Sequence, residues 1–234
     1  MAYFNAVTAL IGNEDSCSID ASIERKTNEE LYQIAKQTQS TFLMHHVILN
    51  QVHVSCYLRE HLRVADLVEN YRRMYAGTKN TGTRRALDIY FVFFEGISAL
   101  CLARDTKQEK WRQIGENSIR TLSRLFDGSA WNFENKLSLL HAELYFLNQC
   151  HTMAELSYQA SISSAHERRF LHEEAMAQEL YGIYLVENNM VGRGVLQLEL
   201  AIGKYEKWGA MRKVDSLKDF IELVNLSNNA WRSN

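Results

Sequence analysis

Eight histidines are the side chains of this 234-residue sequence that suggest chemistry first, because imidazole binds metal ions and transfers protons near neutral pH. His46 and His53 are seven residues apart in an expected helix, so they share a face but lie two turns apart, too far to chelate one ion unaided. The sequence contains no HExxH motif and no Cys/His set at zinc spacing. A phospho-accepting histidine at His45 or His46 would need flanking kinase residues that are absent. We therefore expect no metal site and no catalytic histidine.

Motifs that bind phosphate or activate a nucleophile are missing or incomplete. The chain has no GxxxxGK[ST] phosphate loop and no GxSxG elbow. The short GRG at 192–194 is better explained as a turn with a close-packing glycine. The acidic pair Glu173–Glu174 opens an expected helix, where it favours the helix dipole, and the basic pairs fit solvated faces. These patterns predict no catalytic residue and no cofactor.

The composition suits long helices and argues against several classes of protein. Proline is absent and only 11 glycines occur, so few residues break or weaken a helix. The net charge of −2 gives no attraction to nucleic acid. The most apolar run, residues 89–103, is shorter than the ~20 residues of a membrane span and contains Glu95. Because no signal-peptide pattern opens the chain, we expect a cytoplasmic protein that binds neither nucleic acid nor membrane.

The four cysteines form no CxxC pair and are spread along the chain: Cys17, Cys56, Cys101 and Cys150. The last three stand in apolar helical contexts. We expect reduced, buried thiols, as is typical of a reducing compartment.

Amphipathic segments separated by short polar breaks run through most of the sequence. Their apolar residues recur at helical spacing, and short links force neighbouring helices to pack antiparallel as hairpins. The pattern predicts an all-α fold with an N-terminal segment at 1–40 that is partly loop or frayed helix, a helical domain at 41–228 and a tail at 229–234. The expected helices cover about 41–60, 63–76, 84–104, 107–126, 133–149, 153–167, 170–187, 191–208 and 210–226.

Local signals refine the ends of these helices. Breakers predict loops at 76–83 and 127–132. Thr27 and Glu30 have the spacing of a capping box, which predicts a short helix starting near Asn28. Thr152 and Glu155 have the same spacing, so a second capping box is expected at the start of the helix near Thr152.

Small residues recur at matching positions in the last two hairpins. A small residue in each helix lets the two backbones approach closely, as in tetratricopeptide-type repeats, although the period here is about 40 rather than about 34 residues. The repeat predicts an α-α superhelix of about four tetratricopeptide-like hairpins with a C-terminal capping helix. Two sets of four residues share the spacings 12, 4 and 3, namely Gly182, Gly194, Leu198 and Ala201, and one repeat earlier Ala142, Ala154, Tyr158 and Ser161.

The stretch KYEKWGAMRKV, residues 204–214, predicts how the last hairpin ends. Tyr205 and Trp208 fall on the inner face of its second helix, where core packing is favoured over ligand stacking. Gly209 is placed to take the left-handed conformation that ends helices. Ala210 then begins a closing helix over the apolar end of the stack, because a repeat array needs such a cap.

This C-terminal pattern carries a resemblance. The segments 171–185 and 200–217 resemble the helical region of large multidomain signalling proteins that combine a protein-kinase-like domain with a STAND-type AAA ATPase. That region commonly ends in Tyr-x-x-Trp-Gly-Ala-x-x-Lys-Val, which this chain matches at Tyr205, Trp208, Gly209, Ala210, Lys213 and Val214. The resemblance extends over about 80–225 and is strongest from 131 onward. Nothing here resembles the kinase, the ATPase or an output domain.

The resemblance implies an interaction and relay segment without catalytic parts, either a fragment of a larger gene or a stand-alone relic. We therefore expect a non-catalytic helical-repeat module that contacts a protein partner or adjacent signalling domains, of unknown oligomeric state. Two alternatives stay open. One is a regulatory ATPase or phosphotransfer enzyme with unrecognised motifs, and the other is a small-molecule sensor with a groove near Trp208 and Tyr205.

Overall fold

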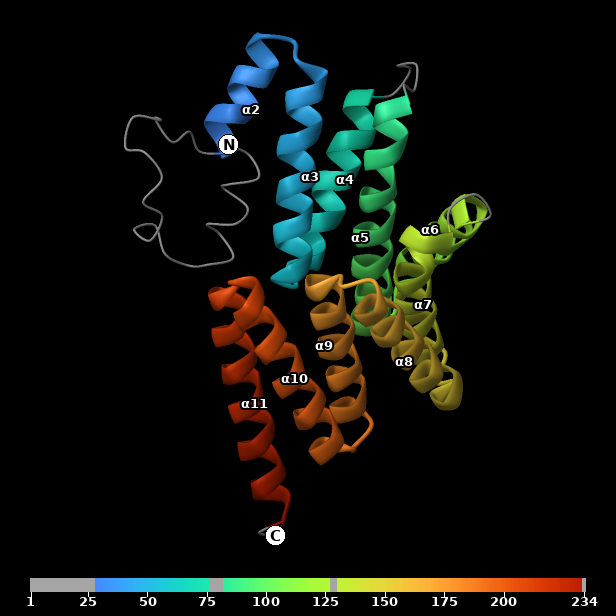
Figure 1. The fold of residues 1–234 in the computed structure, drawn as a ribbon, viewed down its shortest axis with the longest axis vertical. Helices are drawn as coiled ribbons and strands as arrows, with labels where there is room; N and C mark the ends of the chain where they lie inside the picture. The colour runs from blue at the N-terminus through green and yellow to red at the C-terminus, as the bar shows by residue number, and fades with distance from the viewer. Residues whose placement is uncertain (1–27, 76–81, 127–129, 233–234) are drawn as a thin grey trace. The chain divides into compact units, whose positions relative to one another are not determined.

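The computed structural model describes residues 28–75, 82–126 and 130–232, and these form ten α-helices without a strand (Figure 1). The all-α prediction is thereby confirmed for the described residues. The helices are α2 (Asn28–Gln37), α3 (Thr41–Tyr57), α4 (His61–Tyr75), α5 (Gly82–Thr106), α6 (Glu109–Phe126), α7 (Ala130–Leu147), α8 (His151–Glu167), α9 (Leu171–Glu187), α10 (Val191–Trp208) and α11 (Met211–Arg232).

The predicted helices agree closely with the observed ones, except that α11 continues to Arg232, past the expected end at 226 and into the expected tail at 229–234. Three further local predictions need correction. Residues 130–132, expected in a break, begin α7, whereas the rest of that break and most of the expected loop at 76–83 lie outside the described residues. α8 begins at His151 without a side-chain cap, so the capping box at Thr152 is wrong. Cys56 and Cys101 are buried as expected, but Cys150 is exposed at the N-cap of α8, and Cys17 lies outside the described residues.

The chain divides into two compact units, Met1–Leu122 and Ser123–Asn234. In the first unit α2 packs on α3, and α3 and α4 both pack on α5. Its core contains a ring cluster in which Tyr71 stacks on Phe91 and shares a hydrogen bond of 3.0 Å with His45 Nδ1. The second unit contains α7 to α11, and each of these helices packs on the next. No helix among the described residues has the length and apolarity needed to cross a membrane.

One type of link joins the helices of the second unit. It recurs at even intervals along the chain, at Gln149, Arg169, Asn189 and Gly209, and all four residues have left-handed backbones with φ of 58°, 59°, 62° and 85°. At each link the next N–H donates to the carbonyl five residues earlier, as in a Schellman motif. These bonds are Cys150 N to Tyr145 O (2.9 Å), Phe170 N to Ala165 O (2.9 Å), Met190 N to Leu185 O (2.8 Å) and Ala210 N to Tyr205 O (2.9 Å).

The same link occurs in the first unit at Gln39 and Arg59, which are separated by the same interval. Ser40 N donates to Ala35 O at 2.9 Å, and Glu60 N donates to Ser55 O at 2.8 Å. A left-handed backbone strains any residue with a Cβ, so every one of these links except Gly209 makes its turn at some cost in strain. The same link thus joins α2 to α3, α3 to α4, and each helix from α7 to α10 to the next.

Candidate functional site

The predicted helix end at Gly209 is confirmed. α10 ends at Trp208, Gly209 has φ 85°, and α11 starts at Met211 after a two-residue link. A Cβ built on Gly209 would meet nothing within 4 Å, so the backbone angle alone requires glycine here. Ala210 is buried directly after the turn, and its carbonyl accepts from Val214 N at 3.1 Å as α11 begins.

Tyr205 and Lys213, on opposite sides of this turn, meet one carboxylate deep in the second unit. Lys213 Nζ lies 2.6 Å from Glu179 Oε1, and Tyr205 donates its hydroxyl proton to Glu179 Oε2 at 2.8 Å. The side chains of Lys213 and Glu179 are only 2% and 3% exposed. A buried charge is tolerated only when it is paired and hydrogen-bonded, so α9, α10 and α11 are tied to one another at Glu179.

Glu179 is the residue of this cluster that sequence analysis missed. It stands in α9, 26 residues before Tyr205 and 34 residues before Lys213, and no motif at its position marks it. In the structure, residues 173–185 of α9 are all buried, and a carboxylate in such a segment requires a cationic partner, but the sequence of α9 does not show this burial.

Trp208, at the end of α10, packs against a histidine of α9. Its ring stacks on His172 with 5.2 Å between centroids and an interplanar angle of 24°. Burial lowers the pKa of His172, because desolvation disfavours the charged ring more than neighbouring Glu173 favours it. Tyr205 and Val214 are both fully buried. This part of the pattern therefore consists of packed side chains.

The small residues of the last hairpin lie where its two helices touch. A Cβ on Gly182 would come within 2.7 Å of Leu198 Cγ, and a Cβ on Gly194 would come within 2.8 Å of the carbonyl oxygen of Gly182. Ala201 is fully buried further along α10. These glycines thus permit the close backbone approach that their spacing predicted. The corresponding residues of the preceding hairpin are also buried, namely Ala142, Ala154, Tyr158 and Ser161.

Two more carboxylates of α9 bind cations from other helices. Glu173 accepts from Lys136 of α7 at 2.7 Å and also from the Asn135 side chain. Glu174 lies 3.2 Å from Lys204 Nζ of α10. Both glutamates open α9 as predicted, but they are buried and paired in addition to facing the helix dipole. Carboxylates of α9 thus bind cations from three other helices, α7, α10 and α11.

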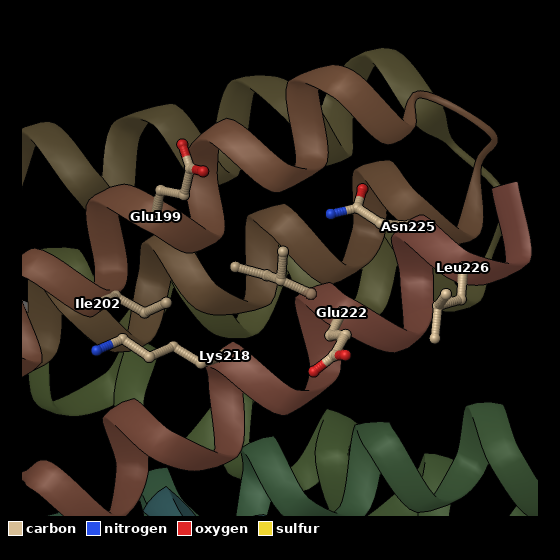
Figure 2. A pocket seen from close by; sticks show the side chains of 7 residues that line it. Glu199, Ile202, Lys218, Glu222, Asn225 and Leu226 are labelled. Carbon is tan, nitrogen blue, oxygen red and sulfur yellow. The ribbon is translucent and has the colours of Figure 1, made fainter. Parts of the chain in front are cut away.

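The described residues line a cavity in each of the two units. In the first unit, a hollow of about 220 Å³ contains Arg72, Glu95, Lys110 and Trp111 among its lining residues. Neither this hollow nor the cavity of the second unit is lined by Tyr205 or Trp208. The cavity of the second unit is a groove of about 470 Å³ between α10 and α11, here called the end groove, and it is lined by Glu199, Ile202, Lys218, Ile221, Glu222, Asn225 and Leu226 (Figure 2).

The hollow of the first unit is dominated by an ion pair. Both terminal nitrogens of Arg72 donate to the Glu95 carboxylate at 2.6 Å. Burial nevertheless raises the pKa of Glu95, because its desolvation outweighs the attraction of Arg72. The guanidinium and carboxylate satisfy each other, which makes this pair a structural contact between α4 and α5.

The described residues include no group of three His, Cys, Asp or Glu side chains arranged to hold a metal ion. Comparison with protein-family models, with curated proteins and with solved structures found no match to this chain.

Proposed function

We propose that this chain is a non-catalytic interaction or relay module, built as a superhelix of tetratricopeptide-like hairpins with α11 as the capping helix. The observation that carries the proposal is the even recurrence of the same left-handed link from Gln149 through Arg169 and Asn189 to Gly209. Repeats of this kind contact mainly their neighbours and present an extended surface, which such proteins use for binding partners. Fold alone does not fix function, so the surface and the partner require direct tests.

The contacts across the hairpins support a common repeat unit. Tyr71 of α4 hydrogen-bonds His45 of α3 across the Arg59 link, and Ser161 of α8 donates to the Asn135 carbonyl of α7 across the Gln149 link. Both pairs are 26 residues apart, and their members stand at the same sequence distances before and after the link. The chemistry of the pair changes while its place in the hairpin is kept, as expected of degenerate repeats.

The outer surface of the second helices also repeats. Leu156 of α8 and Leu196 of α10 occupy matching positions of successive repeats, and they are 55% and 54% exposed. A single exposed leucine is ordinary, but the same exposure at the same place in successive repeats is a feature of a contact surface.

The test is purification of the tagged full chain from its native cells, followed by size-exclusion chromatography and mass spectrometry. We expect a protein that coelutes in fixed ratio, without nucleotide turnover by the purified chain. The variant Leu156→Glu/Leu196→Glu shows whether the repeated leucines contact that protein, with the exposed Glu167→Lys as its control. Elution of the chain alone, together with ATP hydrolysis or phosphotransfer, would favour the enzymatic alternative.

We further propose that the module belongs to, or descends from, a multidomain signalling ATPase or kinase. The support is the Tyr205-to-Val214 pattern, in which Tyr205 and Lys213 tie α9, α10 and α11 together. Sequencing the native transcript beyond both ends of this sequence tests the proposal. A reading frame that continues into a phosphate-loop ATPase or a kinase supports membership in such a protein, whereas a frame without either domain contradicts membership and leaves only a stand-alone relic.

A further inference from the structure

The end groove lies where, in the proposed array, the next helix would pack. One repeat earlier, the positions that correspond to its lining residues fall on α8 and α9, and they include Tyr181, Gly182 and Val186. There the equivalent space is occupied by α10. Gly182 faces Leu198 and Val186 faces Gly194 at close range, and Arg193 of α10 donates to the Tyr181 hydroxyl at 2.9 Å.

The same arginine shows that α10 contacts both walls of that earlier position. Arg193 lies 2.7 Å from Glu155 Oε2 of α8 while it also reaches Tyr181 of α9. A cation on the incoming helix is therefore already used once in this unit to bind a carboxylate on the preceding hairpin. The end groove likewise offers carboxylates to an incoming helix one repeat later.

The end groove is the equivalent site one repeat later, but the side chains that line it differ. Glu222 stands where the earlier repeat has Gly182, and Glu199 stands where it has Gln159. The apolar surface is kept by Ile202, Ile221 and Leu226, and Leu226 is 61% exposed. Figure 2 shows Glu199 reaching from α10 and Glu222 from α11, on either side of the hollow.

The charge of the end groove is negative and uncompensated. The one cation among its described lining residues, Lys218, lies 3.3 Å from Glu206 of α10. Within the described part of the chain, Glu199 and Glu222 have no ion-pair partner. An occupant with cations on its flanks would satisfy both carboxylates, whereas an acidic occupant would be repelled.

We propose that the end groove binds an amphipathic α-helix of a partner protein, with an apolar face directed at Ile202, Ile221 and Leu226 and with Lys or Arg on both flanks toward Glu199 and Glu222. This inference rests on the proposed interaction function and names its site and the chemistry of its partner. The helix takes the position that α10 has on α9. Its axis stands further from α11 than that of α10 does from α9, because Glu222 replaces the glycine that permits the closest approach.

Two synthetic probes test the proposal on the full chain. Both are stapled helical peptides of about the length of α10 with the same leucine and alanine face, one with lysines on its flanks and the other with glutamates. Fluorescence anisotropy measures their binding. We expect the lysine peptide to bind more tightly than the glutamate peptide. We also expect its affinity to fall as the salt concentration rises.

Charge reversal in the groove makes the test specific. The variant Glu199→Lys/Glu222→Lys is expected to weaken binding of the lysine peptide about tenfold and to favour the glutamate peptide. The matched control, Glu167→Lys/Asp219→Lys, makes the same change in net charge at exposed residues outside the groove and is expected to leave both affinities unchanged. Circular dichroism confirms that both variants keep their helices.

Three results would overturn the proposal. They are equal binding of the two peptides, binding that the groove variant leaves unchanged, and self-association of the chain that the groove variant abolishes, since a second copy would then be the occupant. A native partner that coelutes with wild type and with Glu199→Lys/Glu222→Lys alike would overturn the groove assignment and leave the interaction function standing. Absence of any native partner would instead count against the interaction function itself.

Discussion

The close contact of α9 with α10 at Gly182 and Gly194 and the attachment of α11 to α9 at Glu179 hold neighbouring helices together by opposite means. Between α9 and α10, two residues without side chains, Gly182 and Gly194, let the two backbones approach closely. Where α11 meets α9, by contrast, long polar side chains make the contact, because Lys213 and Tyr205 both reach Glu179 in the interior. Close packing of two backbones holds α9 and α10 together at the glycines. At Glu179 the contact depends on a buried charge that has few other partners. The second contact should therefore be the more sensitive of the two to loss of a single side chain.

The largest effect is expected from breaking the polar contact. Lys213→Met leaves the Glu179 carboxylate buried without its cation, which should lower the free energy of unfolding by about 3–5 kcal/mol. Urea unfolding followed by circular dichroism measures the loss. Lys218→Met is the control, because Lys218 and Glu206 are about half exposed and their pair contributes at most about 1 kcal/mol.

A double variant sharpens the same point. Lys213→Met with Glu179→Gln removes both charges and keeps an acceptor for the Tyr205 hydroxyl, so most of the lost stability should return. If the double variant is as unstable as Lys213→Met alone, the methionine itself disturbs the packing and the charge explanation fails.

The glycine contact should be less costly to disturb. In Gly194→Ala the new Cβ would lie 2.6 Å from Val186 Cγ2 and 2.8 Å from the Gly182 oxygen. Overpacking of about 1–3 kcal/mol, partly offset by the better helix propensity of alanine, should give a net loss of about 1–2 kcal/mol. Gly203→Ala in the same helix is the matched control, since a Cβ there meets nothing within 4 Å and should stabilise the protein. Equal effects of the two substitutions would show that the close approach is unimportant.

The links between helices offer a smaller and opposite pair of effects. Gly209→Ala forces a Cβ into φ 85° and should lower stability by about 1 kcal/mol. Gln149→Gly relieves the same strain one and a half repeats earlier and should raise stability by roughly 0.5–1 kcal/mol. Thermal unfolding of both variants checks the signs. A loss in Gln149→Gly would mean that the glutamine side chain stabilises the link more than its backbone strains it.

These links also explain which parts of the structure were predictable from sequence. The bounds of α10 were predicted at 191–208 because Gly209 marks the turn and because no proline interrupts the amphipathic pattern. At Gln149, Arg169 and Asn189 the same turn is made without glycine, so polarity alone marked it and the start of α8 was misplaced by two residues. The capping box at Thr152 was predicted from a spacing that the Schellman-type link overrides.

The candidate site was predictable only in part for a related reason. Tyr205, Gly209 and Lys213 stand close together in sequence, so their pattern is recognisable. Glu179, which gives two of them their role, lies on the preceding helix and looks like any helical glutamate. The end groove was not predicted at all, because it depends on how α10 and α11 lie against each other and not on a motif in either helix.

The smallest expected effect concerns the packing of Trp208 on His172, at the end of α10 and the start of α9. Burial lowers the pKa of His172, so the unfolded chain takes up a proton near the ordinary histidine value of 6.5 while the folded site resists it. Above pH 6.5 the lowered pKa of His172 therefore has no effect on the free energy of unfolding. Below it, stability falls as the pH drops from 6.5 toward the lowered pKa. His172→Phe keeps a ring on Trp208 and removes the titration, so its unfolding midpoint should change less between pH 8 and pH 5.5 than that of wild type. Part of the slope should persist, because burial also lowers the pKa of His141 on α7. If the unfolding midpoint of His172→Phe depends on pH as strongly as that of wild type, the proton is taken up at another residue. The packing of His172 on Trp208 would then have no role in the pH response of the α9–α10 hairpin.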